Sequence, residues 1–449
     1  MRFSDPAVRL LEQSTISPPP PDADDHRRAL PLSFFDMIWL NYCAVERLFF
    51  FPFPHPTSSF VESHLPGLKS ALSFALGIFY PLAGTIRRGS GGRFEISCSA
   101  SDSVPLTVCD YVAADGFHEI SGDHRREIDK LLPLVPKLPL RRDAQPLLAV
   151  QITLFSGHGL CLALAIHHSA CDGFSSMQFV RTWAAAFRKD EAAALPRPVM
   201  DRSVIPDPRR LYEQMEKAVL DDGVEEKMVT SGLPDASIFA TTFTLSASQI
   251  AWLKHRVQAA AEEQRQPSPR CSSFVVSCAY VWICLLKTRA GSCSDEAHFV
   301  FAVDWRRRIR PPIPVNYFGN CLSGCFVKCD SGELLGKDGI FAAAAAIAKA
   351  IEEIGDDAHE NMDGVLDRLG EIVPFRPLSL AGSPKLGVYD VDFGWGKARK
   401  VEVISIRETG AVAMAESRDG EGGIELGIVL PENEMEAFAG FFAGGLRRR

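Results

Sequence analysis

The sequence predicts an α/β protein, with α+β as the alternative, of two similar domains, each a mixed sheet flanked by helices, joined by a long crossover loop. The chain has 449 residues, which is too long for one ordinary core. Strand-like and helix-like runs are mixed in both halves of the chain. Between them, residues 188–235 change to alanine, charge and proline, as in RKDEAAALPRPVMDRSVIPDPRR. We therefore expect an N-terminal domain over 1–187, a crossover over 188–235 and a C-terminal domain over 236–449.

The composition is that of an acidic globular protein. Hydrophobic residues make up 46%, charged residues 23%, and the formal net charge is -8. This balance offers no basic footprint for nucleic acid, so no nucleic-acid partner is expected. The chain has no apolar run of about 18 residues and no secretory start, which predicts a cytoplasmic protein without a membrane partner. Twelve cysteines without a CxxC pair indicate reduced, mostly buried thiols.

The first domain contains an arm, a hairpin and a helix. Residues 1–30 predict an extended arm, because Pro18 to Pro21 cannot donate backbone hydrogen bonds. Order is expected from LPLSFFDMIWL onward. PLLAVQITLF and GLCLALAI predict two strands joined by the turn SGHG. Apolar residues then recur at spacings of three and four and predict an amphipathic helix: Phe174, Met177, Val180, Trp183, Ala184 and Phe187.

The second domain repeats this mixture of strands and helices without a detectable sequence repeat. The stretch TTFTLSASQIAWLKHRV predicts a strand, and Ser246 with Gln249 then forms a capping box that begins an amphipathic helix. FVFAVDW predicts another strand and IFAAAAAIAKAIEEI another helix. KVEVISI and GIELGIVL predict the last strands.

The stretch AIHHSACDGFSS, residues 165–176, carries the titratable residues. The preceding strand delivers His168 to the rim of a sheet, where a neutral imidazole with a pKa near ~6.5 suits proton exchange with a hydroxyl. Asp172 can lie at the same turn and be held by a cation. Gly173 is expected to relieve the backbone where the turn enters the helix.

Other interpretations of this stretch remain open from the residues alone. An isolated HxxxD is short enough to occur by chance. His167, His168 and Asp172 supply three metal ligands without a fourth nearby, so we expect no metal site. Cys171 is disfavoured as a nucleophile, because many other cysteines share its apolar context.

Two further motifs accompany the histidines: NYFGN at residues 316–320, and DFGWG at 392–396 after AGSPKLGVYDV. With HHSACDG, in this order, the chain resembles the BAHD acyltransferases, plant enzymes that transfer acyl groups from coenzyme A thioesters to alcohols or amines. The resemblance includes LPLSFFDMIWL, YPLAGTI, VDWRRR and GGIELG, so it spans nearly the whole chain. It implies two domains that resemble chloramphenicol acetyltransferase, and a monomer.

The resemblance also implies roles for single residues. His168 matches the general base, and His167 is only its neighbour. Asp172 matches an aspartate that turns away from the substrate and pairs with an arginine, here Arg306. The DFGWG residues match positions that shape the fold and the coenzyme channel without reacting: Asp392, Phe393, Gly394, Trp395 and Gly396. In the GSPK element, Ser383 and Lys385 are candidate contacts of the coenzyme.

The substrates follow from the branch that the chain resembles most, which acts on anthocyanins and other flavonoid or phenolic glucosides. It implies acyl-CoA as co-substrate, a sugar hydroxyl as acceptor and no tightly bound cofactor. Many members use malonyl-CoA, whose carboxylate calls for a basic partner, yet the motif is followed by Phe174, Ser175 and Ser176. Arg181 is a substitute candidate, or else a solvated cation. Hydroxycinnamoyl-CoA is the alternative donor, because an aromatic acyl group needs only an apolar slot.

Two alternatives come from other functional classes. A non-catalytic relative would bind acyl-CoA or a phenolic ligand without turnover, and a thioesterase would use water in place of the alcohol. The presence of His168, Asp172 and Arg306 together favours catalysis over binding. A long channel sealed from solvent would suppress hydrolysis.

Overall fold

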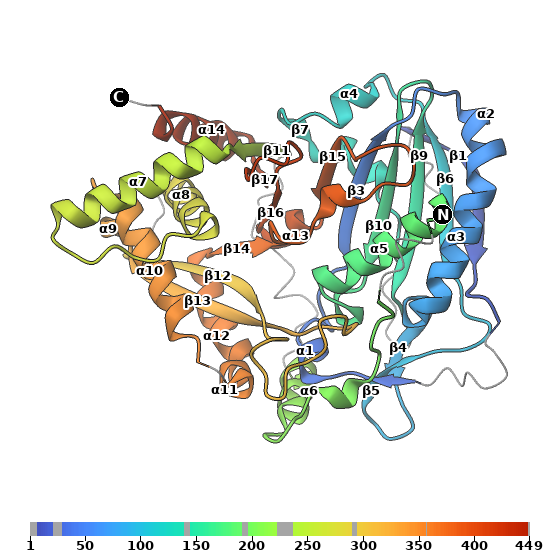
Figure 1. Cartoon of the computed structure of the whole chain (residues 1–449), viewed down its shortest axis with the longest axis horizontal. Helices are drawn as coiled ribbons and strands as arrows, with labels where there is room; N and C mark the ends of the chain where they lie inside the picture. The colour runs from blue at the N-terminus through green and yellow to red at the C-terminus, as the bar shows by residue number, and fades with distance from the viewer. Residues whose placement is uncertain are drawn as a thin grey trace.

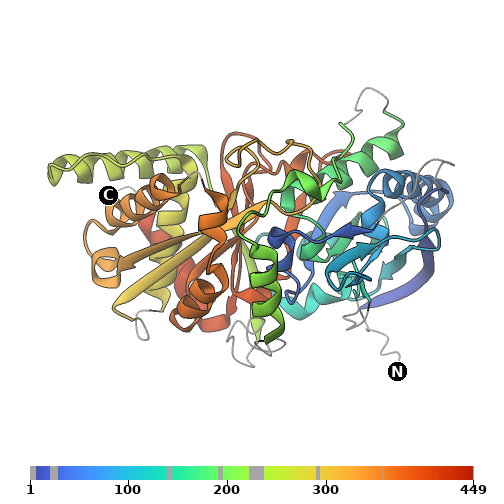
Figure 2. The same ribbon diagram turned by 90° about the horizontal axis from the view of Figure 1, so that it is seen from below.

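The computed structural model describes residues 7–20, 29–138, 144–190, 196–221, 237–289, 294–355 and 357–447. It confirms the two-domain α/β organisation with mixed sheets flanked by helices. Figures 1 and 2 show the domains side by side, the first mainly in blue and green and the second in yellow to red. None of the helices in these ranges has the length and hydrophobicity that a bilayer crossing requires.

The first domain is built on a mixed sheet. Its strands, in spatial order, are β1 Val8–Ile16, β6 Val104–Tyr111, β9 Leu148–Phe155, β10 Gly159–Ile166, β3 Val45–Pro52 and β15 Lys400–Val403. The predicted hairpin is confirmed, because β9 and β10 pair antiparallel from Phe155 opposite Gly159 to Leu148 opposite Ile166. A smaller sheet flanks it, with strands β2 Leu30–Pro31, β5 Phe94–Ser97, β4 Thr85–Arg88 and β8 Gln145–Pro146.

The second domain has its own mixed sheet. Its strands, in spatial order, are β13 Leu322–Asp330, β12 Glu296–Asp304, β14 Leu378–Ala381, β16 Val412–Glu416, β17 Ile424–Pro431, β11 Ile238–Leu245 and β7 Arg126–Glu127. The strands expected from FVFAVDW and GIELGIVL are thus present as β12 and β17. Apolar residues of α7 Ala247–Glu263, α8 Ser273–Thr288, α10 Gly339–Glu353 and α14 Glu432–Gly445 form one core with this sheet.

Helices cover the sheets of both domains. They are α1 Phe34–Met37, α2 Thr57–Ser59, α3 Leu65–Ile78, α4 Phe117–Ile120, α5 Gly173–Arg188, α6 Leu211–Asp221, α7 Ala247–Glu263, α8 Ser273–Thr288, α9 Ser331–Leu335, α10 Gly339–Glu353, α11 Ala358–Met362, α12 Val365–Ile372, α13 Ile406–Thr409 and α14 Glu432–Gly445. The amphipathic helix after the histidines is α5, and the capping box of Ser246 and Gln249 begins α7 as predicted.

Strand β3 shows why the sheet of the first domain is buried on both faces. Alternate residues of a strand point to opposite faces. Phe49 and Phe51 belong to the core formed with α3 and α5, whereas Leu48 and Phe50 belong to a core shared with Val429 of β17. This second core joins the two domains.

The two domains also exchange short strands. KVEVISI does form a strand, β15, but it pairs with β3 of the first domain, with Val401 opposite Phe49. In return, β7 from the first half of the chain pairs with β11, with Glu127 opposite Phe239. Each sheet therefore ends in a strand that the other half of the chain supplies.

The predicted N-terminal arm is wrong in one part. Residues 8–16 form β1, which pairs antiparallel with β6 at the edge of the first sheet. Leu10 and Leu11 are exposed, so this edge strand is stabilised mainly by backbone pairing and its burial pattern gives little sequence signal. The boundaries at 187 and 235 remain a prediction; the crossover contains α6, and residues 222–235 lie outside the described ranges.

Candidate active site

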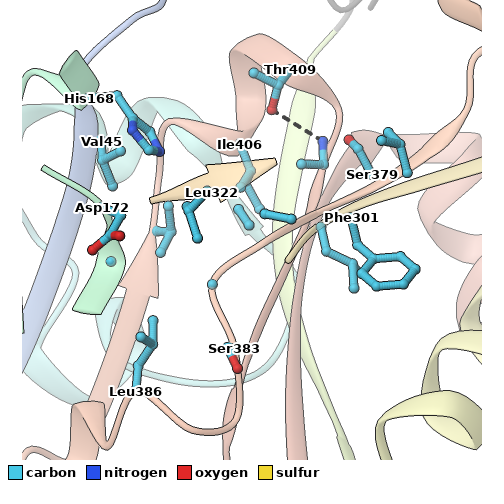
Figure 3. Close-up of a pocket in the computed structure, with 18 of the residues that line it drawn as sticks. Val45, His168, Asp172, Phe301, Leu322, Ser379, Ser383, Leu386, Ile406 and Thr409 are labelled. Carbon is cyan, nitrogen blue, oxygen red and sulfur yellow. Dashed lines mark hydrogen bonds between the residues drawn. The ribbon is translucent and has the colours of Figure 1, made fainter. Parts of the chain in front are cut away.

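A cavity of about 1080 Å³ lies between the domains and contains His168 in its wall. Figure 3 shows His168 and Val45 on one side, across from Phe301 and Ser379 of the second domain. The first domain contributes residues of β3 and β10 and the start of α5, and the second contributes residues of β12, β13, β14 and α13. The apolar wall includes Val45, Phe49, Leu164, Ile166, Val300, Phe301, Leu322, Leu380, Leu386 and Ile406.

His168 is positioned at the end of β10 by a stacked ring and by contacts of its backbone turn. The neighbouring His167 accepts a hydrogen bond at Nδ1 from the Ser169 amide, 3.2 Å away, and this caps the short turn His168–Ala170. Trp39 stacks on the imidazole with the ring centroids 3.8 Å apart and the planes 12° from parallel. The Asn320 side chain donates to the carbonyl oxygen of His168 at 2.8 Å. The sequence prediction that places His168 at a sheet rim therefore agrees with the structure.

Burial keeps both histidines neutral. It lowers the pKa of His168 below its ordinary value of 6.5, and the nearby Asp172 carboxylate only partly opposes this. The His168 Nδ1 atom is buried and makes no hydrogen bond within the described ranges. Burial lowers the pKa of His167 further, to about 4, and His167 does not line the cavity. His168 is thus the neutral imidazole that faces the open space.

Asp172 is locked in a buried ion pair with Arg306, as the sequence interpretation expected. Its Oδ2 lies 2.8 Å from the Arg306 Nη2, and both side chains are at most 3% exposed. Its Oδ1 caps α5 by accepting from the Ser175 amide at 3.0 Å. In Figure 3 the Asp172 carboxylate turns away from Leu322 in the cavity. Burial opposes the charge of Arg306, but Asp172 and Asp304 outweigh it and raise the pKa of that guanidinium.

The NYFGN segment closes this network from the second half of the chain. The Arg306 Nη2 also donates to the carbonyl oxygens of Tyr317 and Gly319, each at 3.3 Å. The Ser175 hydroxyl donates to the same two oxygens at 3.2 and 3.1 Å. The turn between β10 and α5 is therefore fixed to NYFGN by polar contacts that are all buried.

Asp36 and Asn320 were not identified from the sequence as partners. The Asp36 carboxylate is fully buried and accepts from the amide and side chain of Asn320 at 3.0 and 2.9 Å. It also lies 3.4 Å from the Nε of Arg202. The sequence signal was the single acidic residue in the apolar run FFDMIWL, because a buried carboxylate needs partners.

Gly173 differs from its prediction. Its φ is not in the positive range that favours glycine, so it does not relieve a strained turn. It is the first residue of α5, and an added Cβ would lie 3.1 Å from the Leu386 Cδ1. The missing side chain therefore provides room for Leu386, which also lines the cavity.

The DFGWG segment lies outside the cavity wall, because none of its five residues lines the cavity. The Asp392 Oδ1 accepts from the amides of Gly394 and Gly396 at 2.6 and 3.0 Å, and both glycines have positive φ, 91° and 87°. Phe393 is buried edge-on against Trp183 of α5, with centroids 5.2 Å apart. These contacts attach the segment to the first domain.

Of the three candidate binding residues, two line the cavity and one does not. Ser383 and Lys385 line the cavity, and the Lys385 amide donates to the Ser383 hydroxyl at 3.3 Å. Arg181 does not line it; its guanidinium donates to the carbonyl oxygens of Leu386 and Gly387, the latter at 2.9 Å. Arg181 thus supports the loop that carries the other two.

The other chemistries considered at this site gain no support from the geometry. Burial raises the pKa of the Cys171 thiol, with Asp172 adding to the effect, which disfavours the thiolate that a nucleophile requires. In the described part of the chain, no three His, Cys, Asp or Glu side chains are grouped as metal ligands would be.

Comparisons with known sequences show the family, and a comparison with solved structures shows the fold. A family model described as "Transferase family" matches residues 7–442. A malonyl-coenzyme:anthocyanin 5-O-glucoside-6'''-O-malonyltransferase of Salvia splendens is 35% identical, over 97% of this chain and 95% of its own. A coumaroyl-CoA:anthocyanidin 3-O-glucoside-6''-O-coumaroyltransferase of Arabidopsis thaliana is 32% identical, over 98% and 97%. The crystal structure of vinorine synthase superposes with a TM-score of 0.74 at 22% identity, over 97% and 98% of the chains.

Proposed function

This chain belongs to the matched transferase family, the BAHD acyltransferases, and from that premise we propose that it transfers an acyl group from an acyl-CoA thioester to a sugar hydroxyl of a phenolic glucoside such as an anthocyanin. Malonyl is the proposed acyl group. The observation that carries the proposal is the neutral imidazole of His168 in the wall of a large cavity between the domains, where Trp39 stacks on its ring and Asn320 binds its backbone carbonyl.

The proposed mechanism needs no covalent intermediate, because a thioester is already activated. His168 accepts the proton of the sugar hydroxyl through the Nε2 atom while the oxygen attacks the thioester carbonyl. The tetrahedral intermediate then expels the coenzyme thiolate, and the imidazolium returns the proton to the departing sulfur. The cavity holds both substrates in position, which supplies much of the rate. Proton transfer by the histidine contributes about 10² to 10⁴ in rate.

The buried network supports the same reaction by fixing the histidine. Asp172 cannot act as a second base, because its carboxylate is paired with Arg306 and accepts from the Ser175 amide. Its role is to hold the start of α5 beside NYFGN. Ser383 and Lys385, on the loop after β14, are the proposed contacts of the coenzyme, since both line the cavity.

The alternative donor is a hydroxycinnamoyl-CoA. The cavity wall is largely apolar, with Phe301, Leu322 and Ile406 among its residues, and such a wall suits an aromatic acyl group. The coumaroyltransferase that matches nearly the full chain belongs to the same family. A panel of donors with one acceptor decides between the two acyl classes.

Release of free coenzyme A from malonyl-CoA or coumaroyl-CoA is expected only when a flavonoid glucoside is present. The measurement is thiol release with and without the glucoside, together with mass detection of the acylated sugar. Release without an acceptor would identify a thioesterase. No release under either condition would identify a binding protein and contradict the proposed transfer.

The value of kcat/KM should stay high at pH values below the ordinary pKa of a histidine. The reactive form of the base is the neutral imidazole, and burial lowers the pKa of His168 from 6.5. The rate is therefore expected to remain high through pH 6.5 and to fall as the pH drops through the lowered pKa. A profile between about pH 4 and pH 9 measures this limb, and a midpoint above 6.5 would contradict the buried neutral base.

A further inference from the structure

The guanidinium of Arg47 is a buried cation that the mechanism above does not use. Arg47 lies in β3 between Val45 and Phe49, which share its face of the strand because side chains alternate. All three line the cavity, and Arg47 is only 7% exposed. A charged residue thus stands in an otherwise apolar row, two positions along from Val45, which Figure 3 shows beside His168.

Arg47 has only neutral partners in the described ranges. Its Nη1 donates to the Ser176 hydroxyl at 3.3 Å and to the Met177 sulfur at 3.2 Å. Its Nε is buried without an acceptor. No ion pair joins Arg47 to a described carboxylate, whereas the buried Arg126 and Arg306 each have one.

The nearest acidic groups do not fill this gap. Glu416 lines the same cavity and attracts the charge of Arg47, but its Oε1 accepts from the Tyr389 amide and its Oε2 is buried without a partner. Asp172 is paired with Arg306 and Glu402 with Arg126. Arg47 therefore keeps donors for an anion that the described residues do not supply.

A buried guanidinium without a carboxylate is unfavourable for the protein alone. Burial lowers the pKa of Arg47 to about 10, which still leaves the group charged at neutral pH. A planar guanidinium presents donors in a fork that matches both oxygens of a carboxylate. Among the cations of the cavity wall, Arg47 is therefore a buried one without an ion pair to a described carboxylate, and a small carboxylate is its complement.

We propose that Arg47 binds the free carboxylate of the acyl group carried by the coenzyme A donor, a site that selects dicarboxylic acyl groups such as malonyl. The inference rests on the proposed acyl transfer. Val45 pairs with Ile166, two residues before His168, and Arg47 pairs with Leu164, about 7 Å further along the sheet. The Arg47 guanidinium contacts Ser176 at the start of α5, and its charge is close enough to His168 to help lower the pKa of that imidazole. A carboxylate one methylene from a carbonyl beside His168 would therefore lie within the influence of this guanidinium.

The proposal accounts for the neutral residues after the histidine motif. Ser176 holds the Arg47 Nη1, so it orients a cation from the neighbouring strand. Arg181, the basic residue on α5 considered from the sequence, donates to backbone carbonyls outside the cavity wall. The basic partner of the acyl carboxylate is thus assigned to β3.

The test compares malonyl-CoA with butyryl-CoA, which has similar length but no acyl carboxylate, using one glucoside acceptor. Arg47→Met should lower the ratio of kcat/KM for malonyl-CoA over butyryl-CoA about 100-fold, because the carboxylate loses its charged partner. Arg47→Lys keeps the charge without the fork and should lower the ratio about tenfold. Arg181→Met should leave the ratio within about twofold, since its charge lies outside the cavity wall.

Several results would overturn the inference. One is that Arg47→Met leaves the ratio of kcat/KM for malonyl-CoA over butyryl-CoA unchanged. Another is that this ratio falls in Arg181→Met and not in Arg47→Met. A wild-type enzyme that transfers coumaroyl but not malonyl groups would also overturn it, while leaving the proposed acyl transfer intact. Absence of transfer from every acyl-CoA would instead contradict the proposed function.

A binding measurement without acceptor gives a readout that does not need turnover. Malonyl-CoA is expected to raise the unfolding temperature of the wild type more than butyryl-CoA does, and Arg47→Met should abolish that difference. The variant itself is expected to unfold no lower than the wild type, because it removes a buried unpaired charge. Equal shifts by both donors in the wild type would overturn the carboxylate site.

Discussion

His168→Ala is expected to lower kcat/KM about 10²- to 10⁴-fold, the contribution of a positioned general base. The variant removes the imidazole that lines the cavity but leaves Asn320 free to bind the same backbone carbonyl, since that contact does not involve the ring. His168→Gln keeps a polar side chain of similar size without a basic nitrogen and should lose activity to a similar extent. The measurement is steady-state kinetics with the preferred donor and glucoside.

His158→Ala is the matched control. His158 is exposed in the turn before β10, whereas His168 follows the opposite end of the same strand. Eight residues of strand separate them by about 26 Å, so this variant should keep wild-type rates. Thermal unfolding of His168→Ala close to that of the wild type would show that the fold persists. Activity of His168→Ala within about threefold of the wild type would contradict the role of His168 as base.

Asp172→Ala is expected to destabilise the protein by about 3–5 kcal/mol, because it removes the buried carboxylate of Arg306 and leaves that guanidinium only the half-exposed Asp304. The distance of 2.8 Å and the near-complete burial of both groups distinguish this pair from surface ion pairs. Loss of the cap at the Ser175 amide adds to the effect. Arg306→Ala should have a similar effect for the converse reason. Denaturant unfolding measures both, and the double variant should be less destabilised than the sum of the two.

Lys337→Ala provides the comparison with an exposed ion pair. Lys337 lies 2.8 Å from Glu263, and both side chains are more than 60% exposed. Its loss should leave stability nearly unchanged, because solvent screens the pair. Equal effects of Lys337→Ala and Asp172→Ala would show that the buried pair is not a structural requirement.

Local sequence patterns predicted the elements that local interactions determine. The β9–β10 hairpin, helix α5 and the capping box of Ser246 with Gln249 all follow from short-range periodicity and are present. The position of His168 at the end of β10 followed from the same hairpin. The pairing of Asp172 with Arg306 came from the family resemblance, and the structure contains it.

Long-range partners could not be predicted in the same way. Asp36 and Asn320 are 284 residues apart, and neither position carries information about the other in a single sequence. The same applies to β15, whose strand character was evident but whose pairing with β3 was not. Arg47 was not identified from the sequence, because a single cation in the apolar stretch VERLFFF gives no sign that it faces a cavity.

The exchange of β15 and β7 between the sheets limits how this architecture can be recombined. A chimera that takes one half of the chain from this protein and the other from a relative receives the final strand of each sheet from the wrong parent. Such a hybrid must match backbone registers such as Val401 with Phe49 and Glu127 with Phe239, in addition to its substrate contacts. An intact cavity therefore requires both halves of the chain to come from one parent. New specificities are more readily obtained by single substitutions in the cavity wall than by exchanging halves.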